Sequence, residues 1–206
     1  MHGCADELET LVRHARVSDV VLVGDLFTKG PDPAGVWAMV RDRGWRAVLG
    51  NHDERLIDIV DGRRQGDNAG ERCVAILNAF DSGWLEWVRA LPRWLELGET
   101  LVVHAAVHPS GDPDQTAPRT FTHLRRWPSD ARRDVRWTEV YTGERPVVFG
   151  HDAVRGRFER WRNGRRHLVG LDSGCCYGGH LTGYVVGEDR FVSTAALRVY
   201  KEMREP

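Results

Sequence analysis

Apolar residues in the first part of the chain alternate between helical spacing and short uninterrupted runs. Leu8, Leu11 and Val12 recur at helical intervals within residues 6–16, with acidic residues before them and basic residues after, as the helix dipole favours. The sequence VVLVGD that follows is a short β-branched run, which is typical of a buried parallel strand. This alternation predicts an α/β sandwich in which helices cover sheets.

The same patterns predict the remaining elements. Residues 31–44 are expected to form a helix, with Pro33 near its start and Gly44 at its end. RAVLGNHD is expected to be a strand that runs into a loop. The other expected elements are helices over 71–80 and 84–91 and strands over 99–107, 145–152, 167–174, 181–189 and 190–197. Residues 109–136, rich in Pro, Asp, Thr and Arg, are expected to form a surface excursion with a short helix around 121–127.

Composition narrows the class of protein. The 206 residues are 41% hydrophobic and 29% charged, which favours a single globular domain over residues 1–206 and excludes a mostly disordered chain. The net charge of −1 argues against nucleic acid or an anionic membrane as a partner. Four cysteines do not suffice for a disulfide framework at this length, so reduced thiols are expected. No signal peptide or membrane-spanning run is visible, and a cytoplasmic location is expected.

Four apolar runs end in residues that can bind a metal. Asp25 follows the first run, Asn51 and His52 the second, His104 the third and His151 the fourth. A lone histidine at a strand end is usually structural, but four such endings are hard to attribute to chance. Because ligand sites of open α/β sheets lie at the carboxyl ends of strands, these side chains are expected to converge. Mixed oxygen and nitrogen donors suit manganese, iron or zinc better than calcium.

The same segments carry a resemblance to a known family. GDLFTKGP, GNHDE, VVHAAV and FGHD resemble, in order, the motifs of calcineurin-like metallophosphoesterases of the phosphoprotein phosphatase type. Thr28, where protein phosphatases carry Asp, and the ending LDSGCCYGGHLTGYVV make the chain most similar to bacterial symmetrical diadenosine tetraphosphate hydrolases and their small relatives. The resemblance implies a four-layer αββα sandwich of two mixed sheets.

The N-terminus departs from that family pattern. His2, Gly3, Glu7 and Leu8 match its first motif, Asp-x-His-Gly, with Met1 at the x position and the Asp absent together with the first strand. A buried sheet that lacks a central strand leaves backbone groups unpaired at about 1–3 kcal/mol each. The leading hypothesis is therefore a natural start upstream; the alternative is a chain that folds with a damaged first-metal site.

The resemblance also implies roles for individual residues. It implies two divalent metal ions, with manganese favoured and iron, zinc or cobalt as alternatives, held by His2, Asp25, Asn51, His104 and His151. His52 matches the general acid, and Asp53 is a candidate to orient it in place of the Asp that is Thr28 here. Arg125 lies where the family binds phosphate, with Arg126 and Lys29 as further candidates.

Three functions compete at this point. The first is hydrolysis of a small phosphorylated substrate, with a dinucleoside polyphosphate as the leading candidate. The short segment between His104 and His151 keeps a serine/threonine phosphoprotein phosphatase open as an alternative. The missing Asp keeps open a catalytically weakened module that binds phosphorylated ligands.

Trp127, Trp137 and Tyr177 are expected either to stack on adenine or to be core residues. Asp172, Cys175 and Cys176 are expected to be structural, and His108 and His180 to face solvent.

Overall fold

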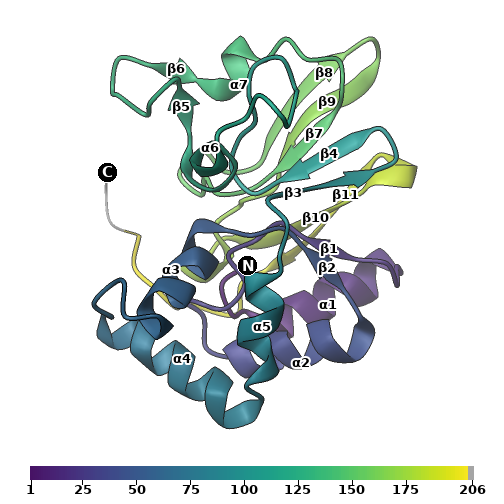
Figure 1. The fold of residues 1–206 in the computed structure, drawn as a ribbon. Coiled ribbons are helices and arrows are strands. Elements are labelled where there is room, and N and C mark those ends of the chain that lie inside the picture. Colours follow the sequence, from purple (N-terminus) through teal and green to yellow (C-terminus); the bar gives the residue numbers. More distant parts are fainter. Residues whose placement is uncertain (204–206) are drawn as a thin grey trace.

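One outer layer of the molecule is made of five helices from the first half of the chain. The computed structural model describes residues 1–203. The helices of this layer are α1 (Ala5–Ala15), α2 (Pro33–Arg43), α3 (Asn51–Val60), α4 (Asn68–Phe80) and α5 (Gly83–Arg89) (Figure 1). Helix α2 begins and ends as its sequence predicts, since Asp32 accepts a hydrogen bond from the Gly35 N–H and Gly44 adopts the left-handed conformation.

These helices pack against a short parallel pair of strands, β1 (Val21–Leu22) and β2 (Arg46–Ala47). Leu26, Phe27 and Trp84 are almost completely buried at the centre of this helical half. The first predicted strand therefore exists, but only two of its residues are paired.

A five-stranded mixed sheet forms the second half, in the order β3-β4-β7-β9-β8. Its strands are β3 (Trp94–Leu97), β4 (Thr100–Val103), β7 (Val147–Phe149), β8 (Phe158–Arg162) and β9 (Arg165–Gly170). Strands β4, β7 and β9 run parallel at its centre. Helices α6 (Pro118–His123) and α7 (Trp137–Val140) cover the outer face, where Trp137 packs edge-on against Phe149 and Tyr141.

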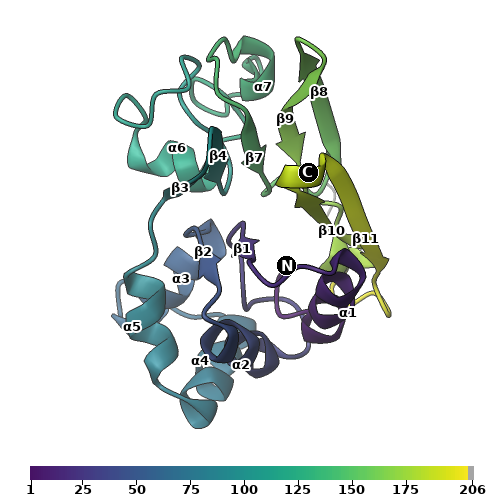
Figure 2. The same ribbon diagram turned by 90° about the vertical axis from the view of Figure 1, so that its right-hand side faces the viewer.

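The inner faces of the two halves meet in an apolar layer that includes Val48, Val102, Val148 and Val169. The hairpin of β10 (His180–Val185) and β11 (Arg190–Ala195) closes one side and packs against α1 (Figure 2). The remaining elements are β5 (Arg126–Trp127), β6 (Val135–Arg136) and the short turns η1 (Cys175–Tyr177) and η2 (Val186–Glu188). Helices, two strand layers and helices again form the expected four-layer sandwich.

The free edges of β1 and β10 face an apolar cavity of about 540 Å³. Within residues 1–203, β1 pairs with no strand other than β2, while β10 pairs with β11 and makes one further bridge, from His180 to Gly174. The cavity is lined by residues of both strands and of α1, among them Leu8, Leu22 and Leu181. At its rim, the N–H groups of His2 and Gly3 donate to the carbonyls of Asp25 and Leu26. The start of the chain and the turn that carries Asp25 therefore lie together beside this cavity.

Several elements differ from the sequence-based expectation. Asn51–Val60 forms helix α3, where a loop was expected at Asn51, and strands β3 and β8 were not expected. The short helix expected around 121–127 is α6, which begins at Pro118, a residue suited to the first helical position, and ends at His123. No helix within residues 1–203 is long and apolar enough to cross a membrane.

Candidate metal centre

Asp25 lies at the centre of the site, in the sharp turn that follows β1. Its backbone is left-handed, with φ of 55°, and the preceding Gly24 has φ of 75°. A Cβ on Gly24 would lie 2.7 Å from Nδ1 of His104, so this turn requires glycine. The Asp25 carboxylate consequently lies between two histidines: Oδ1 is 3.4 Å from Nε2 of His104, and Oδ2 is 3.5 Å from Nε2 of His2.

A buried carboxylate holds this turn in place. Oδ2 of Asp53 accepts hydrogen bonds from the N–H groups of Asp25 and Gly50 at 2.8 and 3.0 Å, and its Oδ1 accepts from the Leu26 N–H at 2.9 Å. Asp53 is completely buried. Its two oxygens are thus engaged with backbone, and within residues 1–203 the structure gives no contact with the His52 ring. Asp53 joins the two loops of the site rather than orienting His52.

Donor atoms on one side of Asp25 converge on a common point. Nε2 of His104 lies 3.1 Å from both Oδ1 of Asn51 and Nδ1 of His151. Together with the Asp25 oxygen, these atoms come from the carboxyl ends of β1, β2, β4 and β7, as the sequence pattern predicted. Donor atoms that share an ion at about 2.1 Å lie about 3.0–3.4 Å apart, so this set fits a divalent transition metal.

The other nitrogen of each histidine in this set is bound to backbone. Nδ1 of His104 donates to the carbonyl of Val23 at 2.7 Å, and Nε2 of His151 donates to the carbonyl of His123 at 2.8 Å. Such bonds set the tautomer and leave the opposite nitrogen lone pair directed into the site. Both rings thus have the orientation that a metal ligand requires.

The opposite side of Asp25 has fewer donors. Within residues 1–203 it comprises His2, whose Nδ1 lies 3.1 Å from Oγ1 of Thr28. The ammonium group of Lys29 is 3.1 Å from Nε2 of His2 and also lies over the Tyr177 ring, 5.3 Å from its centroid. Asp25 and His2 are available to a second ion on this side, next to the positive charge of Lys29.

His52 is the second residue of α3 and lies next to both sides. Its N–H donates to Oδ1 of Asp25 at 2.9 Å, and its ring meets the His2 ring edge-on at 5.0 Å between centroids. The position at the start of a ten-residue helix places it in a field that favours anions. Burial lowers the pKa of His52 to about 4, against the opposing effect of Asp25.

The pKa values of the other candidate ligands favour the protonation states that bind a cation. Burial lowers the pKa of His2 and of His151 well below the ordinary value, so both rings are neutral, the form that binds metals. Burial acts to raise the pKa of Asp25, but the neighbouring His104 outweighs it and holds this pKa well below its ordinary value. Asp25 is ionised accordingly.

The candidate phosphate-binding arginines differ in position. Arg125 donates to the carbonyl of His151 at 3.1 Å and lies 3.9 Å from Asp152, beside the metal ligands. Arg126 instead donates to the carbonyl of Asp134 at 2.7 Å, within the β5–β6 hairpin. The structure therefore brings Arg125, but not Arg126, to His151.

The aromatic residues considered for stacking on adenine differ in their exposure to solvent. Trp137 is buried in the core, which removes it from the surface available to a substrate. Trp127 stays partly exposed and meets the His108 ring edge-on at 5.2 Å, and Tyr177 is likewise partly exposed. Asp172 accepts from the Gly174 N–H at 3.2 Å, as expected of a turn carboxylate, and His180 is exposed.

A neighbouring polar pair was missed by the sequence analysis. Oε2 of Glu54 lies 3.7 Å from Nδ1 of His123 and accepts from the Thr122 hydroxyl at 3.1 Å. The backbone carbonyl of His123 is the partner that orients His151. Glu54 is on α3 and His123 is on α6, and no sequence pattern links two residues so far apart in the chain.

Comparison with known proteins agrees with this geometry. Residues 1–185 match the family model of calcineurin-like phosphoesterases. The chain is 26% identical to the asymmetrical bis(5'-nucleosyl)-tetraphosphatase PrpE of Oceanobacillus iheyensis, over 95% of this chain and 90% of the relative. It is also 26% identical to a symmetrical bis(5'-nucleosyl)-tetraphosphatase of Vibrio cholerae, over 96% of each chain.

Solved structures give the same grouping. The crystal structure of a candidate diadenosine tetraphosphatase superposes with a TM-score of 0.81 at 28% identity, over 95% of this chain and 90% of the other. A metallophosphoesterase from Sphaerobacter thermophilus, at 18% identity and a TM-score of 0.60, shares the fold. The chain thus belongs to the calcineurin-like phosphoesterases, metal-dependent hydrolases that act on phosphoester bonds.

Proposed function

We propose that this protein hydrolyses dinucleoside polyphosphates, with diadenosine tetraphosphate as the leading substrate, at a centre of two divalent ions, manganese in the first place. The observation that carries the proposal is the convergence of donor atoms from Asp25, Asn51, His104 and His151 at 3.1–3.4 Å, directly beside His52. The relatives named as tetraphosphatases, matched over nearly the full chain, support the substrate class.

The metal ligands would divide between the two sides of Asp25. Asp25, Asn51, His104 and His151 would hold one ion, while His2 and the second oxygen of Asp25 would contribute to the other. Bound divalent ions supply Lewis acidity and lower the pKa of a water molecule that attacks phosphorus. Asp53 keeps both loops at the required separation through its three backbone hydrogen bonds.

His52 would act as the general acid that protonates the leaving oxygen. Its place beside the Asp25 carboxylate, whose negative charge favours the protonated ring, supports this role. Burial depresses its pKa, but the negative charge of a bound phosphate acts in the opposite direction and favours the protonated ring. The proton would therefore be available once substrate is in place.

Cationic and aromatic side chains around the ligands would bind the rest of the substrate. Arg125, which lies against the His151 carbonyl, is suited to the two-pronged recognition of phosphate oxygens. Lys29 offers a second positive charge on the His2 side, and the ring of Tyr177 lies beside it. A base stacked on Tyr177 or on Trp127 would be worth about 1–3 kcal/mol.

The test is hydrolysis of diadenosine tetraphosphate by the purified protein with Mn²⁺, followed by separation of the nucleotides. Two ADP molecules indicate symmetrical cleavage, whereas ATP and AMP indicate asymmetrical cleavage, and either result supports the proposal. Release of phosphate only from phosphoserine or phosphothreonine peptides would replace it with the phosphoprotein phosphatase. A lack of turnover on every phosphate ester tested would favour the phospholigand-binding module.

The variant His52→Gln tests the acid role. We expect kcat to fall by roughly 10²–10⁴-fold for a substrate with a poor leaving group, and much less for a nitrophenyl ester, whose leaving oxygen needs no proton. Metal content, measured by mass spectrometry of the digested protein, should remain that of the parent. Equal losses on both substrates would assign His52 another role.

A further inference from the structure

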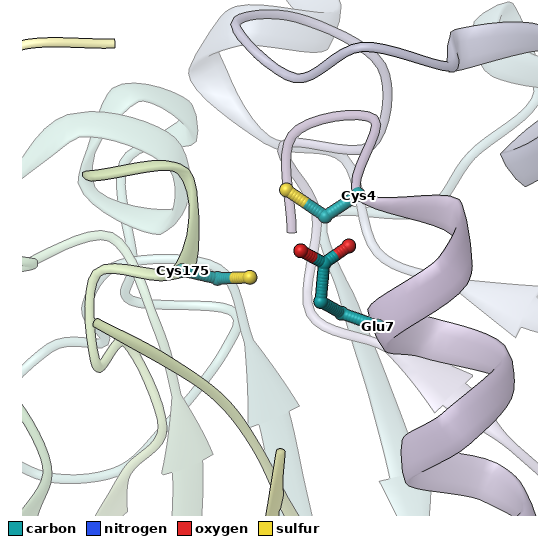
Figure 3. A group of neighbouring side chains, drawn as sticks. All are labelled: Cys4, Glu7 and Cys175. Atoms are coloured by element: carbon teal, nitrogen blue, oxygen red, sulfur yellow. The ribbon is translucent and has the colours of Figure 1, made fainter. Parts of the chain in front are cut away.

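Three side chains converge away from the catalytic donors, between the start of α1 and the turn η1. Cys4 precedes α1, Glu7 lies in its first turn, and Cys175 begins η1. The two sulfur atoms and one carboxylate oxygen of Glu7 all lie within 4.8 Å of one another. In Figure 3 both thiols and the Glu7 carboxylate point into the same space between the two segments. The three residues are 0%, 1% and 5% exposed for Cys4, Glu7 and Cys175.

Only one of the two oxygens of the Glu7 carboxylate has hydrogen-bond partners within residues 1–203. Its Oε1 accepts hydrogen bonds from the Tyr200 hydroxyl at 2.7 Å and from the Leu197 N–H at 3.0 Å. Its Oε2 is buried and has no hydrogen-bond partner within residues 1–203. Burying a carboxylate oxygen without a partner is unfavourable, and a cation bound at this oxygen would remove that cost. The bare oxygen thus points to a ligand in the space that the two thiols share.

The chemistry of the donors identifies the ligand. Sulfur is a soft donor that selects zinc over manganese, magnesium or calcium, whereas the catalytic donors of this chain are oxygen and nitrogen only. We propose that Cys4, Glu7 and Cys175 form a second metal site, which binds zinc and is distinct from the catalytic centre. Zinc–sulfur bonds of about 2.3 Å put tetrahedral ligands about 3.5–3.8 Å apart, so closing the present cluster requires shifts of about 1 Å.

Such an ion would have a structural role. It would tie the start of α1, two residues after His2, to the turn η1, which is contributed by the opposite end of the chain. The hydrogen bonds of Glu7 to Leu197 and Tyr200 already join the same two regions. The site would therefore hold the His2 segment against the closing part of the fold.

Cobalt(II) is the probe that distinguishes this site from the catalytic centre. Thiolate ligands give cobalt an intense charge-transfer band in the near ultraviolet, and ligands of oxygen and nitrogen do not. Reduced, metal-free protein loaded with excess Co²⁺ should show the band, and added Zn²⁺ should remove it. The variants Cys4→Ser and Cys175→Ser should lose it, and Glu7→Gln should weaken Co²⁺ binding by about tenfold or more.

Two controls keep the experiment decisive. Cys73→Ser changes a buried thiol outside the cluster and should retain the band. Asp25→Asn, which disables the catalytic centre, should retain it as well. Circular dichroism must show each variant folded. Absence of the band in the folded parent protein would overturn the proposal, and so would its persistence in both cluster variants. Loss of two titratable thiols without bound metal would identify an oxidised cysteine pair instead.

Discussion

The two sides of Asp25 differ in what they offer a cation. On the Oδ1 side, His104, His151 and Asn51 surround a common point, and hydrogen bonds to backbone carbonyls position the two histidine rings. On the Oδ2 side, the described residues place one imidazole, that of His2, and an ammonium group 3.1 Å from it. The first side is assembled by strand ends of both halves of the molecule, whereas the second depends on a single turn. Ligand number and nearby charge, rather than burial, separate them, since His2 and His104 are both buried.

The largest expected effect comes from removing the residue that both sides share. Asp25→Asn should lower turnover and metal affinity by more than about 100-fold, because loss of an outer partner of a metal ligand already costs 10–100-fold. Metal content and phosphoesterase activity are the measurements, with the exposed Asp19→Asn as the control. If the variant keeps its metal, the shared role of Asp25 is wrong.

A smaller effect is expected from Lys29, whose positive charge lies on the His2 side of Asp25. Lys29→Met removes the positive charge beside His2, and we expect Mn²⁺ to bind about tenfold more tightly on that side, equivalent to about 1.4 kcal/mol. Substrate KM should rise at the same time if Lys29 contacts phosphate. Calorimetric titration with Mn²⁺ measures the first change. Lys201→Met, at the only other lysine, should alter neither.

The smallest effect is expected away from the site, in the core behind β7. Burial raises the pKa of Tyr141 to about 12, while an unfolded tyrosine ionises near pH 10. Because the folded value is the higher one, the stabilisation is complete below about pH 10 and is lost as pH rises towards 12, by about 1–2 kcal/mol.

In Tyr141→Phe the alkaline loss of stability should be smaller by this amount, since Tyr184 and Cys73, whose pKa values are also raised to about 12, still contribute. At neutral pH the variant should be less stable by about 1 kcal/mol, because the hydroxyl no longer donates to the Arg145 carbonyl. Urea unfolding between pH 8 and 12 measures both effects, with Tyr177→Phe as the matched control. Catalytic activity should stay at the parental level. A fall in metal affinity would mean that this core, and not the local hydrogen bonds, sets the position of His151.

Much of the catalytic side was predictable from local pattern. Short apolar runs that end in Asp25, Asn51, His104 and His151 predicted both the strands and the edge at which these donors meet, because parallel strands present their carboxyl ends together. Helix α2 was also predictable from local sequence, because Pro33 and Gly44 set its start and its end through their own backbone conformations. The α/β sandwich followed from the order of elements, and its four layers followed from the family resemblance.

Other features depend on partners far apart in the sequence. Helix α3 was missed because the bonds of Asp53 to Gly50, Asp25 and Leu26, which hold its first turn, join it to another loop. The Glu54–His123 pair depends likewise on the meeting of α3 and α6.

The sequence by itself determined which residue types stand at the strand ends and which segments are apolar enough to be buried. Only the tertiary structure decided that Trp137 is a core residue, that Asp53 binds backbone rather than His52, and that Cys4 and Glu7 face Cys175. The physical reason is that spacing along the chain reports which side chains share a face, while contacts between faces arise only when separate elements pack.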